Sequence, residues 1–147
     1  MSIAHPPHVV ITAEDRQIII TAADQTRLIQ LLNREFRDNV GCRSHLNRLL
    51  HEVHRANVVD ASEVPDNVVT MDSVVELLDP DTSERGVFTL VYPESASVKD
   101  NMLSILAPIG TAILGYRVGD TVSWPTPRGT RQTKIASLIY QPEHYQR

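Results

Sequence analysis

The sequence predicts an α+β chain in which a short antiparallel helical hairpin precedes a mostly antiparallel β domain with one short helix. Apolar residues recur at helical spacing before residue 58, whereas β-branched runs separated by turn sequences dominate from residue 68 onward. The stretch Met102–Val122 contains an expected strand, a short helix, a turn and the start of another strand. It has the features of a compact packing unit and none of catalytic machinery.

Length and composition limit the possible functions. The 147 residues, 41% of them hydrophobic, fit one ordinary domain or a small domain with an appendage. A net charge of −4 argues against nonspecific nucleic-acid binding as the main activity, and we expect no direct sequence-specific contact with nucleic acid. Cys42 is the only cysteine, which excludes an internal disulfide and favours a reducing compartment. Neither a membrane helix nor a signal peptide is recognisable, so we expect a cytoplasmic chain without a membrane partner, and we favour a monomer.

Composition divides the chain into four predicted parts. They are an N-terminal arm at residues 1–17, a helical hairpin at 18–58, a linker at 59–67 and a β domain at 68–147. The linker follows from Pro65, which prevents a helix from continuing. The run Ile18–Ile20 is expected to be a short strand or an apolar contact that anchors the first helix.

Two amphipathic segments predict the hairpin, a short coiled coil. Thr21 is the expected N-cap of the first helix, with Asp24 at the favourable end of the helix dipole. The helix should end near Asn39-Val40-Gly41, and the second should run from about Arg43 to Asn57. The apolar positions of the two segments are Leu28, Leu31, Leu32 and Phe36, then Leu46, Leu49, Leu50 and Val53. We expect a hairpin about 25 Å long, from a rise of 1.5 Å per residue.

The β domain is predicted from short extended runs between turns. The expected strands are Val68–Leu78, Val87–Tyr92, Met102–Ala107, Thr121–Trp124 and Gln132–Tyr140. Pro108 suits the first turn of the short helix, and Gly115 suits a left-handed residue at its end. Imperfect alternation in the last strand allows for a β-bulge.

The residues just described resemble the C-terminal domain of the bacterial GreA/GreB transcript-cleavage factors, a small FKBP-like α+β domain. The shared pattern comprises Ser104, Pro108, Ala112, Leu114-Gly115, Val118-Gly119-Asp120, Val122, Pro127 and Gly129. A closer resemblance is to the Rnk group, regulators of nucleoside diphosphate kinase. It is carried by Val68-Val69-Thr70-Met71, Thr89-Leu90-Val91-Tyr92-Pro93, Ala107-Pro108 and Tyr140-Gln141-Pro142-Glu143.

The resemblance implies a protein that binds RNA polymerase near its secondary channel. In the cleavage factors a long coiled coil enters that channel, and acidic residues at its tip help to hold a catalytic magnesium ion. Their globular domain docks outside, partly through the loop before the short helix. Here that loop carries Leu106 and Ala107 where the cleavage factors usually have an acidic residue and a serine. Rnk proteins depart from the cleavage factors in the same way.

Three other chemistries are considered. Glu35 and Asp38 could face the same way near the tip and bind Mg²⁺, but neighbouring arginines favour a surface salt-bridge role. A zinc site has the right residue types but no fixed ligand spacing, so these side chains are expected on a solvated helix surface: Cys42, His45, His51 and His54. Prolyl isomerisation needs an aromatic pocket, and aromatic residues make up only 5% of the chain.

The sequence therefore predicts a non-enzymatic protein, without a cofactor or metal, that docks on RNA polymerase. It would compete with longer channel-binding factors such as GreA, GreB or DksA. The expected contact residues are Leu106, Ala107, Pro108 and Ile109 in the domain, with Asp38, Asn39 and Arg43 at the hairpin tip. Leu106 and Ile109 could equally be core residues. The alternatives are a cleavage-stimulating factor that uses tip carboxylates and Mg²⁺, or an interaction module unconnected with transcription.

Overall fold

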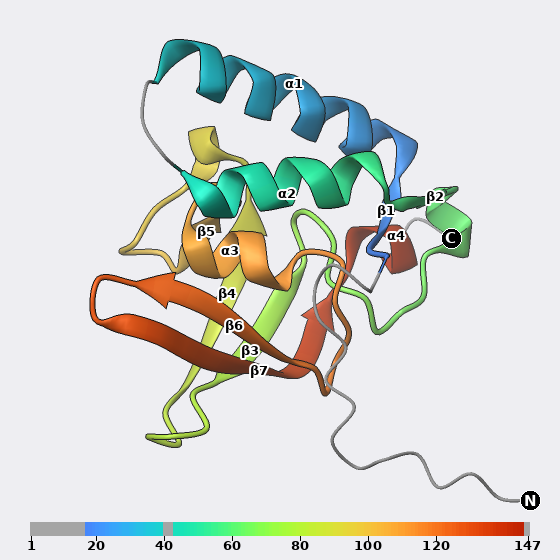
Figure 1. Cartoon of the computed structure of the whole chain (residues 1–147). Helices are drawn as coiled ribbons and strands as arrows, with labels where there is room; N and C mark the ends of the chain where they lie inside the picture. Colours follow the sequence, from blue (N-terminus) through green and yellow to red (C-terminus); the bar gives the residue numbers. More distant parts are fainter. Residues whose placement is uncertain (1–16, 40–42, 146–147) are drawn as a thin grey trace, which may run out of the picture.

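A computed structural model describes residues 17–39 and 43–145, and Figure 1 shows the arrangement of its helices and strands. Most of the predicted arm, together with Val40, Gly41 and Cys42, lies outside the described residues. The helices are α1 (Ala22–Asp38), α2 (Ser44–His54), α3 (Pro108–Ile113) and α4 (Pro142–Tyr145), with 3₁₀ turns η1 (Ala61–Glu63) and η2 (Pro93–Ser95). The strands are β1 (Ile19–Thr21), β2 (Asn57–Val59), β3 (Val74–Leu78), β4 (Arg85–Val91), β5 (Met102–Ser104), β6 (Thr121–Thr126) and β7 (Gly129–Tyr140).

The β domain is built on a five-stranded sheet in the order β5-β4-β3-β7-β6. All neighbouring strands in it are antiparallel except β4 and β5, which are parallel. The register between β3 and β7 shifts twice, so the predicted bulge is confirmed. A second, two-stranded parallel sheet joins β1 to β2 at the base of the hairpin. The α+β fold with an N-terminal hairpin is therefore confirmed.

The hairpin begins as predicted and ends earlier. The backbone N–H of Asp24 donates to Oγ1 of Thr21 at 3.2 Å, which confirms the N-cap. The second helix ends at His54 and not near Asn57, because Asn57–Val59 leaves the helix to pair with β1. Pairing with β1 also confirms that part of the Ile18–Ile20 run is a strand.

The first predicted strand of the β domain is too long, since only Val74–Leu78 joins the sheet. The preceding residues pair elsewhere, because Val69 donates to the carbonyl of Tyr116 at 2.9 Å and accepts from Gly115 at 2.8 Å. Asp72 then takes a left-handed conformation (φ 66°), which turns the chain before the strand starts. The run is rich in β-branched residues on both sides of Asp72, and strand propensity does not reveal where the pairing partner changes.

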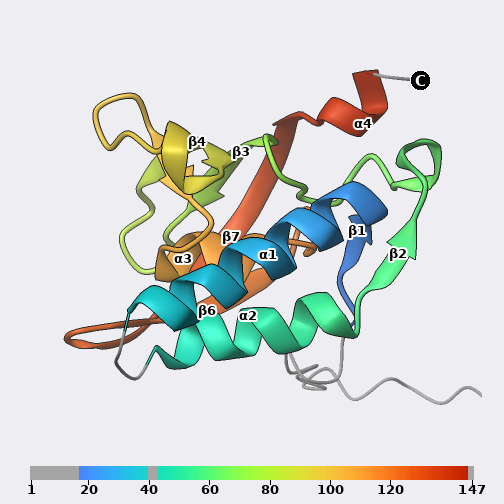
Figure 2. The ribbon, with the colours of Figure 1, turned by 90° about the horizontal axis from the view of Figure 1, so that it is seen from above.

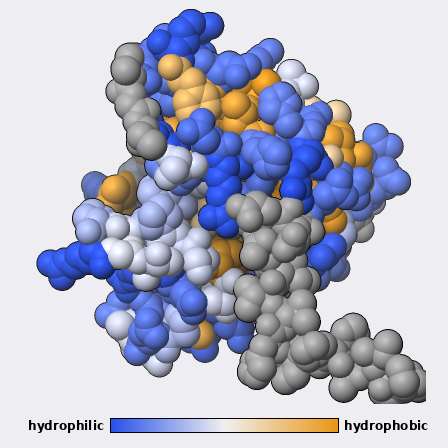
Figure 3. Space-filling view, in the orientation of Figure 1, coloured by the Kyte–Doolittle hydropathy of each residue, from blue (hydrophilic) through white to orange (hydrophobic). Residues whose placement is uncertain are grey.

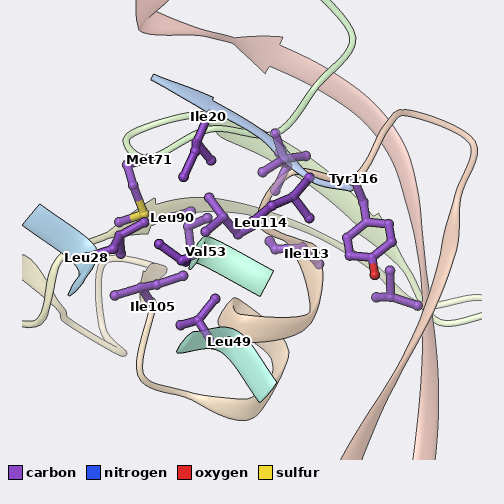
Figure 4. Close-up of a cluster of buried hydrophobic side chains, with 14 of the residues drawn as sticks. Ile20, Leu28, Leu49, Val53, Met71, Leu90, Ile105, Ile113, Leu114 and Tyr116 are labelled. Atoms are coloured by element: carbon purple, nitrogen blue, oxygen red, sulfur yellow. The ribbon is translucent and has the colours of Figure 1, made fainter. Parts of the chain in front are cut away.

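The hairpin lies along the domain. Figures 1 and 2 show α1 and α2 side by side on one face, with α3 between them and the sheet. Five hairpin side chains are at most 1% exposed and belong to the same core as the sheet: Leu28, Leu32, Leu46, Leu49 and Val53. In the close-up of Figure 4, Leu28, Leu49 and Val53 meet Ile105 and Ile113 of the domain, among others.

This shared core fixes the hairpin in place. At roughly 1.5–3 kcal/mol for each buried side chain, exposing five of them costs on the order of 10 kcal/mol. Most native proteins are stable by only about 5–15 kcal/mol in total. Lifting the hairpin away would therefore cost about as much as unfolding the protein. Within residues 17–39 and 43–145, no helix is both long enough and apolar enough to cross a membrane.

Candidate docking surface at the hairpin tip and the 104–109 loop

The 104–109 loop is a tight turn between β5 and α3. Ser104 forms it, since Oγ of Ser104 accepts from the amide of Leu106 at 3.0 Å and its carbonyl accepts from the amide of Ala107 at 3.1 Å. The strand therefore ends at Ser104, and its predicted extension to Ala107 is wrong. Pro108 is the first residue of α3, as predicted, because the first helical turn does not need the missing N–H.

Helix α3 fixes the backbone of the loop through hydrogen bonds and one close contact. Oγ1 of Thr111 donates to the carbonyl of Ile105 at 2.8 Å, and the amide of Thr111 donates to the carbonyl of Ala107 at 2.9 Å. Gly110 touches the loop backbone so closely that an added Cβ would lie 2.1 Å from the Ser104 carbonyl oxygen. The conformation of the loop is thus fixed before any partner arrives.

The four β-domain residues predicted to contact a partner are all partly accessible. Leu106, Ala107, Pro108 and Ile109 are each half-buried. Leu106 and Ile109 also pack against the core cluster, so each side chain both supports the fold and presents a part of its surface. The loop therefore offers a small apolar surface on a rigid backbone.

Glu35 organises the described part of the hairpin tip. One of its carboxylate oxygens accepts from the guanidinium of Arg43 at 2.5 Å and from the side-chain amide of Asn39 at 3.0 Å. Asp38 stays outside this group and lies 3.8 Å from the guanidinium of Arg37. The structure therefore brings Asn39 and Arg43 together on Glu35, whereas Asp38 pairs with Arg37. A salt-bridge role for Glu35 is confirmed.

His45 joins the tip to the loop. Its Nε2 lies 3.0 Å from the carbonyl oxygen of Leu106, a contact between residues 61 positions apart in the sequence. A carbonyl can only accept, so Nε2 carries the proton and donates. The link places the N-terminus of α2, which Arg43 precedes, directly beside the loop. Arg43, one of the predicted tip contacts, therefore lies near the predicted contacts of the loop.

Sequence reasoning missed this role of His45. The sequence predicts His45 on a solvated helix surface together with Cys42, His51 and His54. This prediction is wrong for His45, which is partly buried and hydrogen-bonded, and Cys42 lies outside the described residues. The signal was present, because four residues at 100° each place His45 about 40° from the buried Leu49 on α2. A polar side chain at the edge of an apolar face needs a partner.

Elsewhere, the described residues line a cavity but form no metal cluster. Among the described residues, no group of three or more His, Cys, Asp or Glu side chains could hold a metal ion. At the base of the hairpin, a cavity of about 410 Å³ lies between the first turn of α1 and the residues before and after the sheet. Burial raises the pKa of Asp24 in its wall, and the nearby carboxylates of Glu143 and Asp72 raise this pKa further.

Apolar and polar surfaces are unevenly distributed over the hairpin. On the face seen in Figure 3, hydrophobic colour gathers over the two helices near the tip, within a largely hydrophilic surround. The partly buried apolar residues of the hairpin include Ile29, Leu31, Phe36 and Leu50. They pack against the buried core cluster and leave part of their apolar surface exposed.

Comparison with known proteins places both halves of the chain. Residues 64–140 match the family described as transcription elongation factor GreA/GreB, C-terminal, and residues 16–59 match the Rnk N-terminus. The regulator of nucleoside diphosphate kinase from Escherichia coli K12 is 37% identical over 127 residues, which cover 86% of this chain and 91% of that protein. Transcription elongation factor GreA from Thermodesulfovibrio yellowstonii is 34% identical over 65% of this chain and 61% of that protein.

A solved structure agrees with the sequence matches. The prokaryotic transcription elongation factor GreA/GreB from Nitrosomonas europaea superposes with a TM-score of 0.71 at 36% identity, over 84% of this chain and 100% of that chain. The resemblance to FKBP-like domains in particular stays a prediction. Because the family match covers more than half of the chain and the similarity to a regulator of nucleoside diphosphate kinase covers most of it, the chain belongs to the GreA/GreB family of transcription elongation factors and carries the N-terminal hairpin of its Rnk members.

Proposed function

We propose that this chain is a cytoplasmic transcription regulator that binds RNA polymerase near the secondary channel and acts by occupancy, without catalysis. The observation that carries the proposal is the 104–109 loop, which is partly exposed, apolar and held in one conformation by Ser104, Gly110 and Thr111. A surface ordered in advance loses little entropy on binding. Family membership supplies the expected partner, since the resemblance implies that the same loop contacts polymerase.

The packing of the hairpin favours occupancy over insertion. Helix α1 has 17 residues and spans about 25 Å at 1.5 Å per residue. Core contacts hold both helices against the domain, and the His45–Leu106 hydrogen bond keeps the N-terminal end of α2 beside the loop. A protein of this shape would cover a docking site at the channel mouth and exclude longer factors from it.

The cleavage alternative finds little support in the tip geometry. An Mg²⁺ ion needs carboxylate oxygens that converge on it. Glu35 instead has Arg43 and Asn39 bound to the same carboxylate oxygen, and Asp38 faces its neighbour Arg37. To bind Mg²⁺, these carboxylates would first have to leave their partners.

Binding is tested by capture of core RNA polymerase on the immobilised chain at moderate salt. We expect the wild-type chain to retain polymerase and Pro108→Asn to retain much less, because the substitution places a polar side chain on the apolar surface. Val98→Asn is the matched control, since Val98 is 97% exposed on another loop. If the wild-type chain captures no polymerase, the alternative of an interaction module unconnected with transcription takes over.

Two assays separate occupancy from cleavage. Added to polymerase together with GreA, this chain should displace GreA in proportion to its concentration. Added alone to stalled elongation complexes with Mg²⁺, it should leave the transcript at full length. Shortening of the transcript that depends on Mg²⁺ and disappears in Glu35→Gln would establish the cleavage alternative.

A further inference from the structure

We infer that the hairpin tip and the 104–109 loop form one continuous docking surface, and that His45 is the positioning residue that holds its two parts in register. This inference rests on the proposed function and assigns a role to a residue for which the family resemblance provides none. The hydrogen bond from Nε2 of His45 to the carbonyl of Leu106 is its starting observation.

The bond joins two elements that share a core and are each ordered by hydrogen bonds of their own. On one side, Ser104 and Thr111 fix the loop from within the domain. On the other side, the carboxylate of Glu35 accepts hydrogen bonds from Arg43 and Asn39 and so orders the described part of the tip. His45 lies two residues after Arg43, so its bond to Leu106 ties the tip to the loop. This bond adds to the shared core, whose fully buried positions in α2 begin at Leu46 and continue along the helix away from the tip.

The composite surface selects the chemistry of its partner. The loop supplies half-buried apolar side chains from Leu106 to Ile109. Beside it, the side chain of Arg43 is 36% exposed while it pairs with Glu35, so its guanidinium retains further N–H donors. We therefore expect a polymerase segment with an apolar ridge and a carboxylate or carbonyl acceptor at one flank. Loop and tip should engage this segment together.

Affinity measurements on four variants test the role of His45. His45→Ala removes the donor, and His45→Gln keeps an N–H group at nearly the same position as Nε2. His51→Ala changes an exposed histidine on the same helix and is the matched control. We expect polymerase binding at least fivefold weaker for His45→Ala, and within twofold of wild type for His45→Gln and His51→Ala. Arg43→Ala should also weaken binding at least fivefold.

A double variant distinguishes positioning from general stability. If His45 acts by placing Arg43, then His45→Ala should have no further effect in the Arg43→Ala background. A residue that merely stabilises the fold would weaken both backgrounds equally. Thermal melts accompany each variant, and His45→Gln provides the comparison if His45→Ala unfolds.

The outcomes separate the two proposals. If wild type binds and Pro108→Asn weakens binding, while His45→Ala and Arg43→Ala do not, the proposed function stands and the composite surface is wrong. Equal losses for His45→Ala in the wild-type and Arg43→Ala backgrounds would also overturn the positioning role. Failure of the wild-type chain to bind would overturn both proposals.

Discussion

Gly110 and Ser104 approach each other so closely that no side chain fits between them, since a Cβ atom at position 110 would lie 2.1 Å from the Ser104 carbonyl oxygen. That oxygen also accepts the amide of Ala107 at 3.1 Å, so it cannot move away without disturbing the turn. The same contact that packs α3 against β5 therefore shapes the 104–109 loop.

Gly110→Ala should lower the free energy of unfolding by about 3 kcal/mol, at the upper end for a methyl group forced into a packed site. Urea unfolding measures this cost. Polymerase capture should also fall, because the loop must shift to admit the methyl group. Ala112→Gly, on the same helix, is the control and should cost only about 1 kcal/mol through lost helix propensity. A Gly110→Ala chain as stable as wild type would show that the backbone adjusts freely.

Two left-handed glycines allow backbone strain to be separated from overlap. Gly115 has φ 81°, and a Cβ there would lie 2.3 Å from Cβ of Ile18. Gly119 has φ 96° with nothing within 4 Å of the added atom. Gly119→Ala should cost about 1 kcal/mol, the strain of a left-handed alanine. Gly115→Ala should cost about 2 kcal/mol more, because overpacking adds to the strain. Equal urea midpoints for the two variants would contradict the close approach of Ile18.

The cap of α1 is a separate, local contribution. Thr21→Ala removes the acceptor for the amide of Asp24 and should lower the free energy of unfolding by about 1 kcal/mol. Thr21→Ser keeps the hydroxyl and should stay close to wild type. Denaturant unfolding of the two variants side by side checks the difference. A loss of the same size in Thr21→Ser would assign the effect to the methyl group.

Asp24 should make stability depend on pH in the acidic range. Burial raises its folded-state pKa above the ordinary 3.8, and Glu143 and Asp72 add to the increase. The folded chain therefore holds this proton more tightly than the unfolded chain does. The resulting contribution to stability is fully present below about pH 3.8, and it is lost as pH rises through the raised pKa.

Asp24→Asn should remove this dependence, since an amide does not titrate and its oxygen can still accept from the hydroxyl of Tyr92, which donates to Asp24 at 2.8 Å. We expect Asp24→Asn to melt higher than wild type at pH 7, with the difference closing towards pH 3. Melting curves across that range provide the measurement. A constant offset at all pH values would show that Asp24 has an unshifted pKa.

Local signals account for what the sequence predicts well. The cap at Thr21, the helix start at Pro108 and the left-handed Gly115 depend on a residue type and its near neighbours. Each is found where it was expected. The bulge in β7 can be predicted from the sequence in the same way, because it interrupts the alternation of side chains along a single strand.

Distant partners account for what the sequence does not predict. Val69 is β-branched and apolar, yet it pairs with Tyr116 outside the sheet, and strand propensity carries no information about the partner. His45 is polar on an amphipathic helix, and only the fold shows that Leu106 lies within its reach. The position of the hairpin on the domain depends on the same kind of long-range contact.

The shared core predicts that hairpin and sheet unfold together. Trp124, the only tryptophan, lies in β6, and its fluorescence reports on the sheet, whereas far-UV ellipticity reports mainly on the helices α1 and α2. The two signals should have coincident midpoints, as expected for one cooperative unit.

Leu49→Ala in α2 should lower the free energy of unfolding by about 3 kcal/mol, because it leaves a cavity in that core. Both signals should shift equally, and Asn47→Ala on the exposed face should shift neither by more than about 0.5 kcal/mol. If Leu49→Ala moved the ellipticity transition and left Trp124 fluorescence in place, the hairpin would be an independent unit, free to swing away from the docking loop.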